Sequence, residues 1–283
     1  MKETVLITGA NSFIANHLVT LLQTRYNVKF LTRKPTKSNE YAWDTQQKTL
    51  DEAALDDVNY IVHLAGSKLN DGTPLTEERK KMIYESRIGA ANLILETLNK
   101  RNQMIKSFVS ASAIGYYGFS DNTLEIDENG AFGHGFAAEL SRDWELAADQ
   151  FKTENRAENV AKIRVALVLG NEGGIFPMYK NMVESNPKIA SQNQDNYVPW
   201  NHVEDMAGIF AFAVEHQLDG VYNCVAPEPA SQSDIFKTIA NQLGISNEPI
   251  SAFDGQHLVS KKIIEAGYQF KFPNIISAVS NLI

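Results

Sequence analysis

The stretch TVLITGANSFIA, residues 4–15, constrains the fold more than any other part of the chain. Its apolar run Val5–Ile7 contains β-branched residues and predicts a buried parallel strand. The run ends at Thr8 and Gly9, and the residues after the turn repeat their apolar members at helical spacing. A strand, a glycine turn and a helix in this order are typical of a dinucleotide-binding unit, in which the helix N-terminus holds a diphosphate.

The glycine motif in this turn is incomplete. A G-x-x-G-x-x-G turn would have glycines at positions 9, 12 and 15, whereas this chain has Gly9, Ser12 and Ala15. Gly9 can make the tight turn, and the hydroxyl of Ser12 can cap the helix or bond a phosphate. Ala15 is small enough for the helix to pack on the strand. The same residues also fit an ordinary strand–turn–helix that binds nothing, because a lone glycine motif is weak evidence.

The second predicted strand, Val28–Leu31, ends in Thr32, Arg33 and Lys34. Dinucleotide folds contact the adenine ribose at this point, and an acidic residue here would accept a hydrogen bond from its 2′-hydroxyl. Two cations and a hydroxyl suit a 2′-phosphate instead, because a guanidinium can hold a phosphate through two hydrogen bonds. The pattern therefore favours NADP over NAD, with a solvated basic turn as the alternative.

Strand and helix patterns alternate through the first part of the chain. Further strands are predicted at 41–44, 59–64, 106–112 and 160–168, and long helices at 75–100 and 136–153. This alternation predicts an α/β fold with a doubly wound parallel sheet of the Rossmann type. The pattern becomes irregular afterwards. We therefore expect an NADP-binding Rossmann domain at 1–168 and a smaller mixed substrate lobe at 169–283, with residues 201–225 returning to the sheet.

Two helix starts are marked in the second part of the chain. Ser231 and Asp234 form a capping-box pattern before an apolar helical repeat that runs to Leu243. Pro273 suits the first position of the last helix.

Composition narrows the class of partner. A net charge of −8 disfavours nucleic acid, and the six histidines lack metal-ligand spacing, so no metal site is expected. One cysteine, Cys224, excludes an internal disulfide and fits a reducing compartment. No signal peptide and no membrane-length apolar stretch are visible. We expect a cytoplasmic protein with a small-molecule substrate, and no membrane partner.

Several motifs, in order along nearly the whole chain, resemble one family. They are TGANSFIA, LTRKP, YAWD, HLAG, PLTEERKKMIYESRIGA, VSASAIGYYG, RDWE, ALVLGNEGG, PWNHVED, VAPEPAS and IIEAGYQFKFP. The chain resembles the extended short-chain dehydrogenase/reductases. It is most similar to the atypical, sugar-nucleotide epimerase-like branch of the NAD-dependent epimerase/dehydratases, which carries a characteristic C-terminal extension.

The resemblance implies NADP binding by residues on several strand ends. The residues expected to contact the cofactor are Gly9, Asn11, Ser12, Phe13, Ile14, Thr32, Arg33, Leu64, Ala65, Gly66, Arg87 and Val168. The first five would lie under the diphosphate and the next two at the adenosine end. From the residues alone, Arg87 could equally pair with a surface carboxylate. Relatives with this fold often form homodimers through their two long helices, here the helices expected at 75–100 and 136–153.

The catalytic residues depart from the family pattern. The superfamily uses a serine with Tyr-x-x-x-Lys, in which the lysine activates the tyrosine for proton transfer. Ser112 lies at a strand end where the family serine belongs, but the helix expected to carry the tyrosine and lysine reads GFAAELSRDWE. Tyr116 is our candidate for proton transfer, although no cation is expected close to it. Tyr117, His134 and Glu139 could also transfer the proton, and each fits a structural role as well.

Two functions follow from these observations. The first is an NADP-dependent oxidoreductase or epimerase/dehydratase-like protein that acts on a carbonyl or nucleotide-sugar substrate. The second is a non-catalytic, redox-sensing NADP-binding protein that has lost the Tyr-x-x-x-Lys chemistry. A third outcome, loss of cofactor binding, is tested by titration with NADPH.

Overall fold

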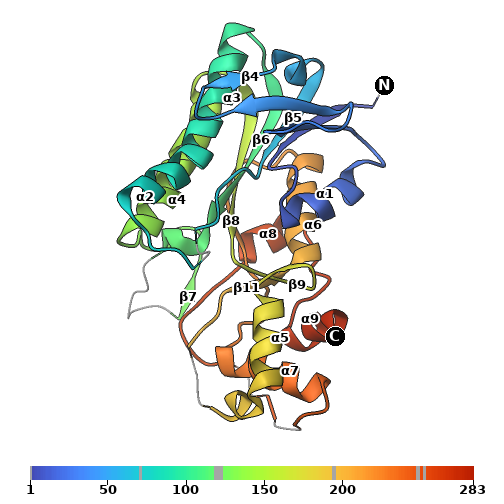
Figure 1. Ribbon diagram of the computed structural model, residues 1–283, viewed down its shortest axis with the longest axis vertical. Coiled ribbons are helices and arrows are strands. Elements are labelled where there is room, and N and C mark those ends of the chain that lie inside the picture. Colours follow the sequence, from blue (N-terminus) through green and yellow to red (C-terminus); the bar gives the residue numbers. More distant parts are fainter. Residues whose placement is uncertain (1, 70–71, 118–123, 193–195, 247–248, 251–252) are drawn as a thin grey trace.

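A large parallel sheet forms the centre of the molecule in the computed structural model, which describes residues 2–69, 72–117, 124–192, 196–246, 249–250 and 253–283 (Figure 1). Its strand order is β12-β8-β6-β5-β1-β2-β3-β4. The strands are β1 (Thr4–Thr8), β2 (Asn27–Thr32), β3 (Glu40–Asp44), β4 (Thr49–Leu50), β5 (Val58–His63), β6 (Ile105–Ala113), β8 (Ala157–Val165) and β12 (Gly220–Cys224). Only the pairing of β4 with β3 is antiparallel within this sheet. The predicted doubly wound Rossmann sheet is therefore confirmed.

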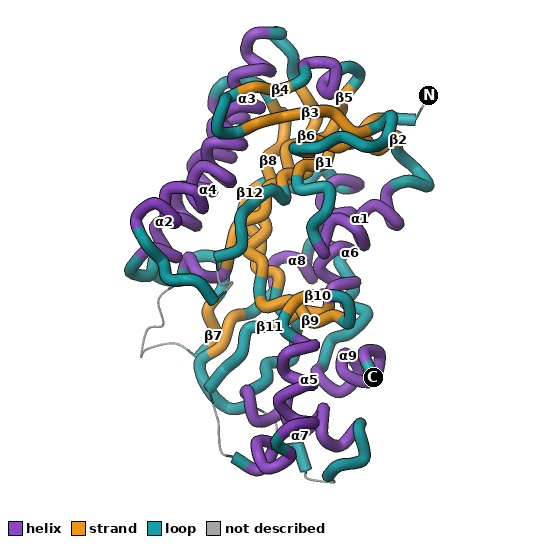
Figure 2. The backbone as a smooth tube through the Cα atoms, viewed as in Figure 1, coloured by secondary structure: helices purple, strands orange, loops and turns teal. Residues whose placement is uncertain are grey.

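Helices cover both faces of the sheet (Figures 1 and 2). One face carries α1 (Phe13–Leu22) and α6 (Val203–Glu215), and the other carries α2 (Glu77–Tyr84), α3 (Ala90–Lys100) and α4 (Phe136–Thr153). Val5, Leu6 and Ile7 of β1 are fully buried between these layers. The apolar run at the start of the sequence thus forms a buried parallel strand, as predicted, and its side chains are covered from both sides.

The single helix predicted at 75–100 is interrupted. A π-helical turn, η2 (Glu85–Gly89), separates α2 from α3. The hydroxyl of Ser86 donates to the carbonyl of Ile83 at 2.7 Å, and Arg87 donates to the same carbonyl at 3.2 Å. These side chains satisfy a carbonyl that an α-helix would pair with a backbone N–H, which fits a local change of helical register.

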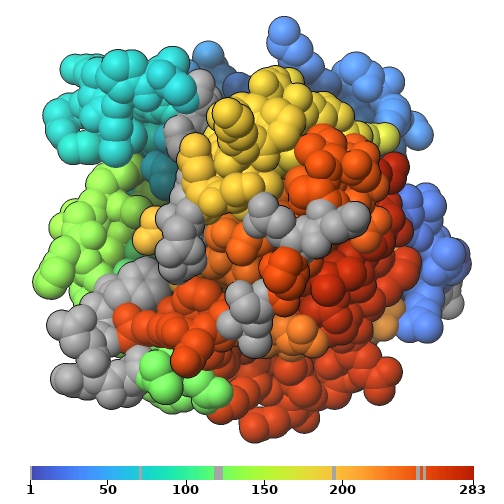
Figure 3. All heavy atoms as spheres, turned by 90° about the horizontal axis from the view of Figure 1, so that it is seen from below, coloured from blue at the N-terminus to red at the C-terminus, as the bar shows by residue number. Residues whose placement is uncertain are grey.

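A second lobe lies at the lower end of the molecule in Figures 1 and 2. Its three-stranded sheet has the order β10-β9-β11. The elements of the whole molecule that have not yet been given bounds are η1 (Glu52–Leu55), η3 (Ile114–Tyr116), β7 (Glu125–Ile126), β9 (Leu167–Gly170), β10 (Gly173–Gly174), α5 (Phe176–Ser185), η4 (Pro187–Ser191), β11 (Trp200–His202), α7 (Gln232–Gln242), β13 (His257–Leu258), α8 (Lys261–Glu265) and α9 (Ile275–Leu282). Helices α5, α7 and α9 pack around a separate apolar core that contains Phe176, Trp200 and Phe236. Seen from below, α5 and later segments of the chain form the surface of this end (Figure 3).

The helix starts in this lobe follow cap chemistry. Ser231 and Asp234 form the predicted capping box, with each side chain accepting from the other's backbone N–H. The placement of Pro273 at the first turn of the last helix is wrong, because Asn274 is the N-cap and its side chain accepts from the N–H of Ser277 at 2.9 Å. An asparagine supplies the acceptor that a helix start needs, whereas proline supplies none.

Over the described residues, the helices are too short or too polar to cross a bilayer. The same residues contain no cluster of three or more His, Cys, Asp or Glu side chains that could hold a metal ion. β12 belongs to the large sheet although it comes from the second part of the chain. The boundary at residue 168 stays a prediction.

Candidate functional site

The turn after β1 brings the backbone of two neighbouring strands close together. Gly9 has φ +74°, and a Cβ on it would lie 2.9 Å from the carbonyl oxygen of Leu64 at the end of β5. A side chain there would be both strained and too close to that backbone. Gly9 therefore fills the role that the sequence predicted for a tight turn at the carboxyl end of the sheet.

The first turn of α1 leaves backbone donors free. Ser12 caps the helix by accepting from the N–H of Ala15 at 3.2 Å. The N–H groups of Phe13 and Ile14 have no hydrogen-bond partner among the described residues. Ala15 is fully buried, so it packs without needing to be a glycine. Free N–H groups at the positive end of a helix dipole suit a diphosphate, so this turn fits the cofactor despite its two missing glycines.

A buried pair fixes the backbone beside this turn. The hydroxyl of Thr8 accepts from the N–H groups of Leu64 and Ala65 at 3.1 and 3.0 Å. The same hydroxyl therefore donates to Nδ1 of His63 at 2.9 Å. Because Nδ1 accepts, the ring proton of His63 is on Nε2, which donates to the carbonyl of Arg87 at 3.1 Å. Burial lowers the pKa of His63 to about 4. This pair was not predicted from the sequence; Thr8 and His63 are the last residues of β1 and β5.

Arg87 lies against the strand end where the sequence predicted the cofactor. A Cβ on Gly66 would lie 2.9 Å from its guanidinium carbon. Its Nη2 donates to the carbonyl of Ser67 at 2.9 Å, and its guanidinium lies 5.1 Å from the ring centroid of Trp144. Burial lowers the pKa of Arg87 to about 10. Among the described residues Arg87 has no carboxylate partner, so the surface ion pair that the sequence also allowed is not what the structure contains.

The remaining predicted cofactor residues lie after β1, at the end of β2 and in β9. Thr32 ends β2, and the exposed side chains of Arg33 and Lys34 follow it without an ion-pair partner in the described part of the chain. Asn11 is exposed in the turn. Val168 lies in β9, which pairs with β11. Thr32 and Asn11 thus lie at the carboxyl ends of β2 and β1, where ligands of open parallel sheets bind, whereas Val168 belongs to the separate three-stranded sheet.

Phe13 links the opening turn to the second lobe. Its ring occupies a space bounded by Gly170 and Gly173, where a Cβ would lie 2.3 and 2.9 Å from ring atoms. The glycines of the segment GNEGG therefore serve packing in this structure. The first residue of α1 and the strand β9 are held against one another by this contact.

Ser112 is engaged by a charged pair. Its hydroxyl donates to Oε1 of Glu145 at 2.7 Å, and both residues are buried. Glu145 binds Arg164 through two hydrogen bonds, from Nε at 2.7 Å and from Nη2 at 2.9 Å. Because a hydroxyl has a single proton, Ser112 in this arrangement has none to give to a substrate oxygen.

Arg164 continues the network toward the loop after β6. Its Nη1 donates to Oη of Tyr117 at 2.6 Å and to the carbonyl of Glu128 at 3.2 Å. Tyr117 in turn donates to Oδ1 of Asn223. Burial raises the pKa of Tyr117 to about 12. Burial also disfavours the charge of Arg164, but Glu145 outweighs it and raises the pKa of this guanidinium.

Tyr116 occupies a different environment from its neighbour. Its ring centroid lies 3.6 Å from the guanidinium carbon of Arg164, and its side chain is half-buried. Its hydroxyl has no hydrogen-bond partner among the described residues. The expectation that no cation lies near Tyr116 is wrong, because Arg164 lies over its ring. Arg164 on β8 is the register partner of Ser112 on β6, and η3, which contains Tyr116, directly follows β6. Of the two tyrosines, Tyr116 has the hydroxyl that is free to meet a ligand.

His134 and Glu139, which the sequence also suggested for proton transfer, lie away from this network. Both are exposed, and neither bonds to Ser112, Glu145 or Arg164. Cys224 is buried against Met206, and burial raises the pKa of its thiol, as expected for a structural cysteine.

Comparison with known proteins gives a consistent family signal. A family model described as the NAD dependent epimerase/dehydratase family matches residues 5–225. The epimerase family protein SDR39U1 of Homo sapiens is 28% identical over 304 residues and aligns with 99% of both chains. The epimerase family protein ML0860 of Mycobacterium leprae is 27% identical over 236 residues, which cover 82% of this chain and 75% of the relative.

Two solved structures share the fold. A nucleoside-diphosphate sugar epimerase from Corynebacterium glutamicum superposes with a TM-score of 0.81 at 28% identity. The match covers 100% of this chain but 58% of that longer protein. The human SDR39U1 structure, solved with NADPH, has a TM-score of 0.76 at 24% identity and covers 99% of this chain and 98% of its own.

Proposed function

This chain belongs to the NAD dependent epimerase/dehydratase family, and we propose that it binds NADP and acts as an oxidoreductase or epimerase on a carbonyl or nucleotide-sugar substrate. The observation that carries the proposal is the turn at Gly9, whose close approach to Leu64 and free N–H groups at Phe13 and Ile14 suit a diphosphate. The solved human relative with NADPH supports the choice of cofactor.

Particular residues would hold each part of the cofactor. The N–H groups of Phe13 and Ile14 would bind the diphosphate, and Arg33 would bind the 2′-phosphate of the adenosine. When bound, the nicotinamide supplies or accepts a hydride. Tyr116 is the group that would give a proton to the substrate oxygen, or take one from it, because its hydroxyl is free whereas those of Ser112 and Tyr117 are bonded.

A redox-sensing protein without catalysis is the second candidate. It is favoured by one observation: the hydroxyl of Ser112 donates a hydrogen bond to Glu145 in the place where the superfamily serine would face a substrate. The cytoplasmic location expected from the single cysteine stays a prediction.

Calorimetric titration tests the cofactor. NADPH should bind at least ten times more tightly than NADH, and Arg33→Ala should lower the NADPH affinity by about 1.5–3 kcal/mol, as expected for hydrogen bonds to a charged group. Arg25→Ala is the matched control, because Arg25 follows the far end of α1 and pairs with Glu215 at 2.9 Å. An unchanged NADPH affinity in Arg33→Ala contradicts the assignment of the 2′-phosphate.

A second assay separates the enzyme from the sensor. Loss of NADPH absorbance is followed with a panel of carbonyl compounds and nucleotide sugars. Turnover with any of them supports the enzyme, whereas tight NADPH binding without turnover on the whole panel favours the sensor.

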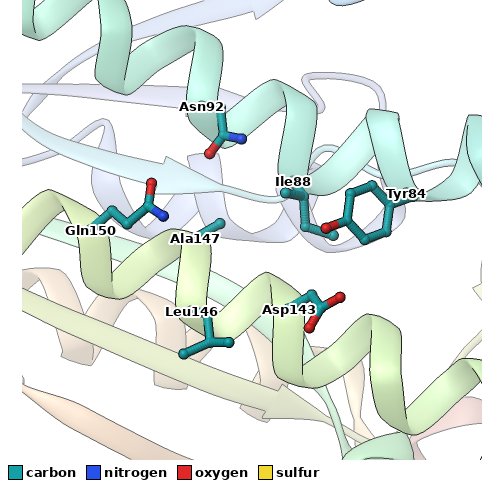
Figure 4. A pocket seen from close by; sticks show the side chains of 7 residues that line it. All are labelled: Tyr84, Ile88, Asn92, Asp143, Leu146, Ala147 and Gln150. Carbon is teal, nitrogen blue, oxygen red and sulfur yellow. The ribbon is translucent and has the colours of Figure 1, made fainter.

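We further propose that two copies associate through the long helices on one face of the sheet. A groove of about 310 Å³ lies between these helices and is lined by Tyr84, Ile88, Asn92, Asp143, Leu146, Ala147 and Gln150 (Figure 4). Leu146 is 55% exposed there, and Oδ1 of Asn92 is buried without a partner in the described part of the chain. A second copy would cover the leucine and could supply a donor to the amide.

Light scattering after gel filtration tests this association. The chain should elute as a dimer, and Leu146→Glu should convert it to a monomer because a carboxylate would be buried in the interface. Met104→Glu is the control, since Met104 is 56% exposed away from the groove. A wild-type monomer at high concentration contradicts the proposal.

A further inference from the structure

The guanidinium of Arg164 is fixed from several directions. Glu145 holds it through two hydrogen bonds, and Tyr117 and the carbonyl of Glu128 accept from its Nη1. The ion pair is buried, with both side chains less than a tenth exposed. A guanidinium that is bonded along both edges has its plane fixed, so the aromatic ring on its face is fixed as well.

Tyr116 is the ring on that face. Its centroid lies 3.6 Å from the guanidinium carbon, well within the range of a cation–π contact, and its hydroxyl is unpaired among the described residues. η3 (Ile114–Tyr116) directly follows β6, so the ring lies just beyond the carboxyl end of that strand. The helix α4 contributes Glu145 to this arrangement and has neither a tyrosine nor a lysine at its start.

We propose that Arg164, held by Glu145, is the positioning residue for Tyr116, and that this arginine–tyrosine pair replaces the missing tyrosine–lysine pair. The inference rests on the function proposed above. In the reductive direction, with a hydride supplied to the carbonyl carbon by the nicotinamide of NADPH, Tyr116 Oη would give its proton to the carbonyl oxygen. The phenolate that remains then takes a proton from water. The fixed cation beside the ring stabilises the negative charge that develops on Tyr116 during this step.

The pair also explains why Tyr117 is not the reacting group. Tyr117 Oη accepts from Arg164 and donates to Asn223, so both of its hydrogen-bonding roles are used within the protein. It contributes to holding the guanidinium in place. Tyr116 meets the same cation through its ring and keeps its hydroxyl available.

An NMR experiment tests the positioning without any turnover. The tyrosine rings are labelled with ¹³C, and the Tyr116 signal is assigned with Tyr116→Phe. Arg164→Met should move this signal and speed the flipping of the ring, because methionine keeps the length of the side chain but loses the planar cation. Arg156→Met is the matched control, since Arg156 precedes β8 at its opposite end and bonds Asn99 at 2.6 Å. An unmoved Tyr116 signal in Arg164→Met overturns the proposal.

Kinetics test whether the two residues act as a unit. With NADPH and the dicarbonyl probe 9,10-phenanthrenequinone, Tyr116→Phe and Arg164→Met should each lower kcat by about 100-fold, the usual range for a proton-transfer group. KM and the NADPH dissociation constant should stay within about threefold. The double variant should be no slower than Tyr116→Phe alone, because the arginine acts only through the tyrosine. Losses that multiply in the double variant overturn the proposal.

The two experiments distinguish failure of the proposed function from failure of the proposed Arg164–Tyr116 pair. If the wild-type protein reduces no carbonyl, the proposed function fails, while the NMR result still decides whether Arg164 positions Tyr116. Arg164→Met leaves the buried carboxylate of Glu145 unpaired and can unfold the protein. In that case the double variant Glu145→Gln/Arg164→Met, which removes both charges, takes its place in both experiments, with the same expected results.

Discussion

Acid should weaken this fold through His63. The ring is fully buried and neutral, with Nδ1 accepting from Thr8 and Nε2–H donating to the carbonyl of Arg87. Its pKa is about 4 in the folded protein, against 6.5 for an unperturbed histidine, because burial disfavours the charged ring. The unfolded chain therefore takes up a proton first as the pH falls. The contribution of the neutral His63 ring to the free energy of unfolding is therefore complete above pH 6.5 and is lost progressively toward pH 4.

The size of the effect follows from the two pKa values. Each unit of difference corresponds to about 1.4 kcal/mol, so His63 should cost about 2 kcal/mol between pH 7 and pH 5 and about 3 kcal/mol in the acid limit. Urea unfolding at pH 7, 6 and 5 measures it. His63→Gln keeps a donor for the carbonyl of Arg87 but does not titrate, so its stability should fall less steeply with pH than that of the wild type.

The comparison of the two slopes isolates this residue. His202 is also buried, and burial lowers its pKa to about 4, but it is present in both proteins and cancels. His134→Gln, a change at an exposed histidine, should follow the wild-type curve. Parallel curves for wild type and His63→Gln would refute the assignment of a neutral buried ring.

Three further substitutions probe the opening turn and a cap. Gly9→Ala should lower the free energy of unfolding, measured by thermal unfolding, by about 1–3 kcal/mol and should weaken NADPH binding. Gly72→Ala is the control, because Gly72 has a similar φ of +84° but lies in open space. It should lower stability through backbone strain alone and leave NADPH binding unchanged. Gly170→Ala should cost about 1–3 kcal/mol and weaken NADPH binding, because its Cβ would lie 2.3 Å from the ring of Phe13; equal affinity would contradict that contact's role. Ser231→Ala should lower the urea midpoint by removing about 1 kcal/mol of capping energy, and an unchanged midpoint would contradict it.

The features that sequence predicted well are those set by neighbours along the chain. The apolar run Val5–Ile7, the turn at Gly9 and the capping box at Ser231 each depend on a few consecutive residues. The helix α4 (Phe136–Thr153) has the predicted limits, because its apolar residues repeat regularly between a glycine-rich start and a polar end. Local periodicity was sufficient for these elements.

The arrangement around Tyr116 was not predictable in the same way. Arg164 stands in a largely apolar run, VAKIRVALVL, in which Lys162 is the other charge, and nothing in this run indicates a partner for the arginine. Its neighbour Ser112 is distant in sequence, and only the register between β6 and β8 brings the two together. Glu145 then reaches the same point from α4. Sequence spacing contains no information on such a register, so the cation beside Tyr116 was missed.

The position of β12 has a consequence for how this chain can be divided. β12 comes from the second part of the sequence, yet it pairs along all of its length with β8 and closes that side of the large sheet. A fragment that stopped after residue 168 would leave β8 with a row of unpaired backbone N–H and C=O groups facing outward. Exposed strand edges of this kind recruit other chains. Expression of the first lobe alone should therefore yield aggregates, and the two lobes are expected to fold together as one cooperative unit.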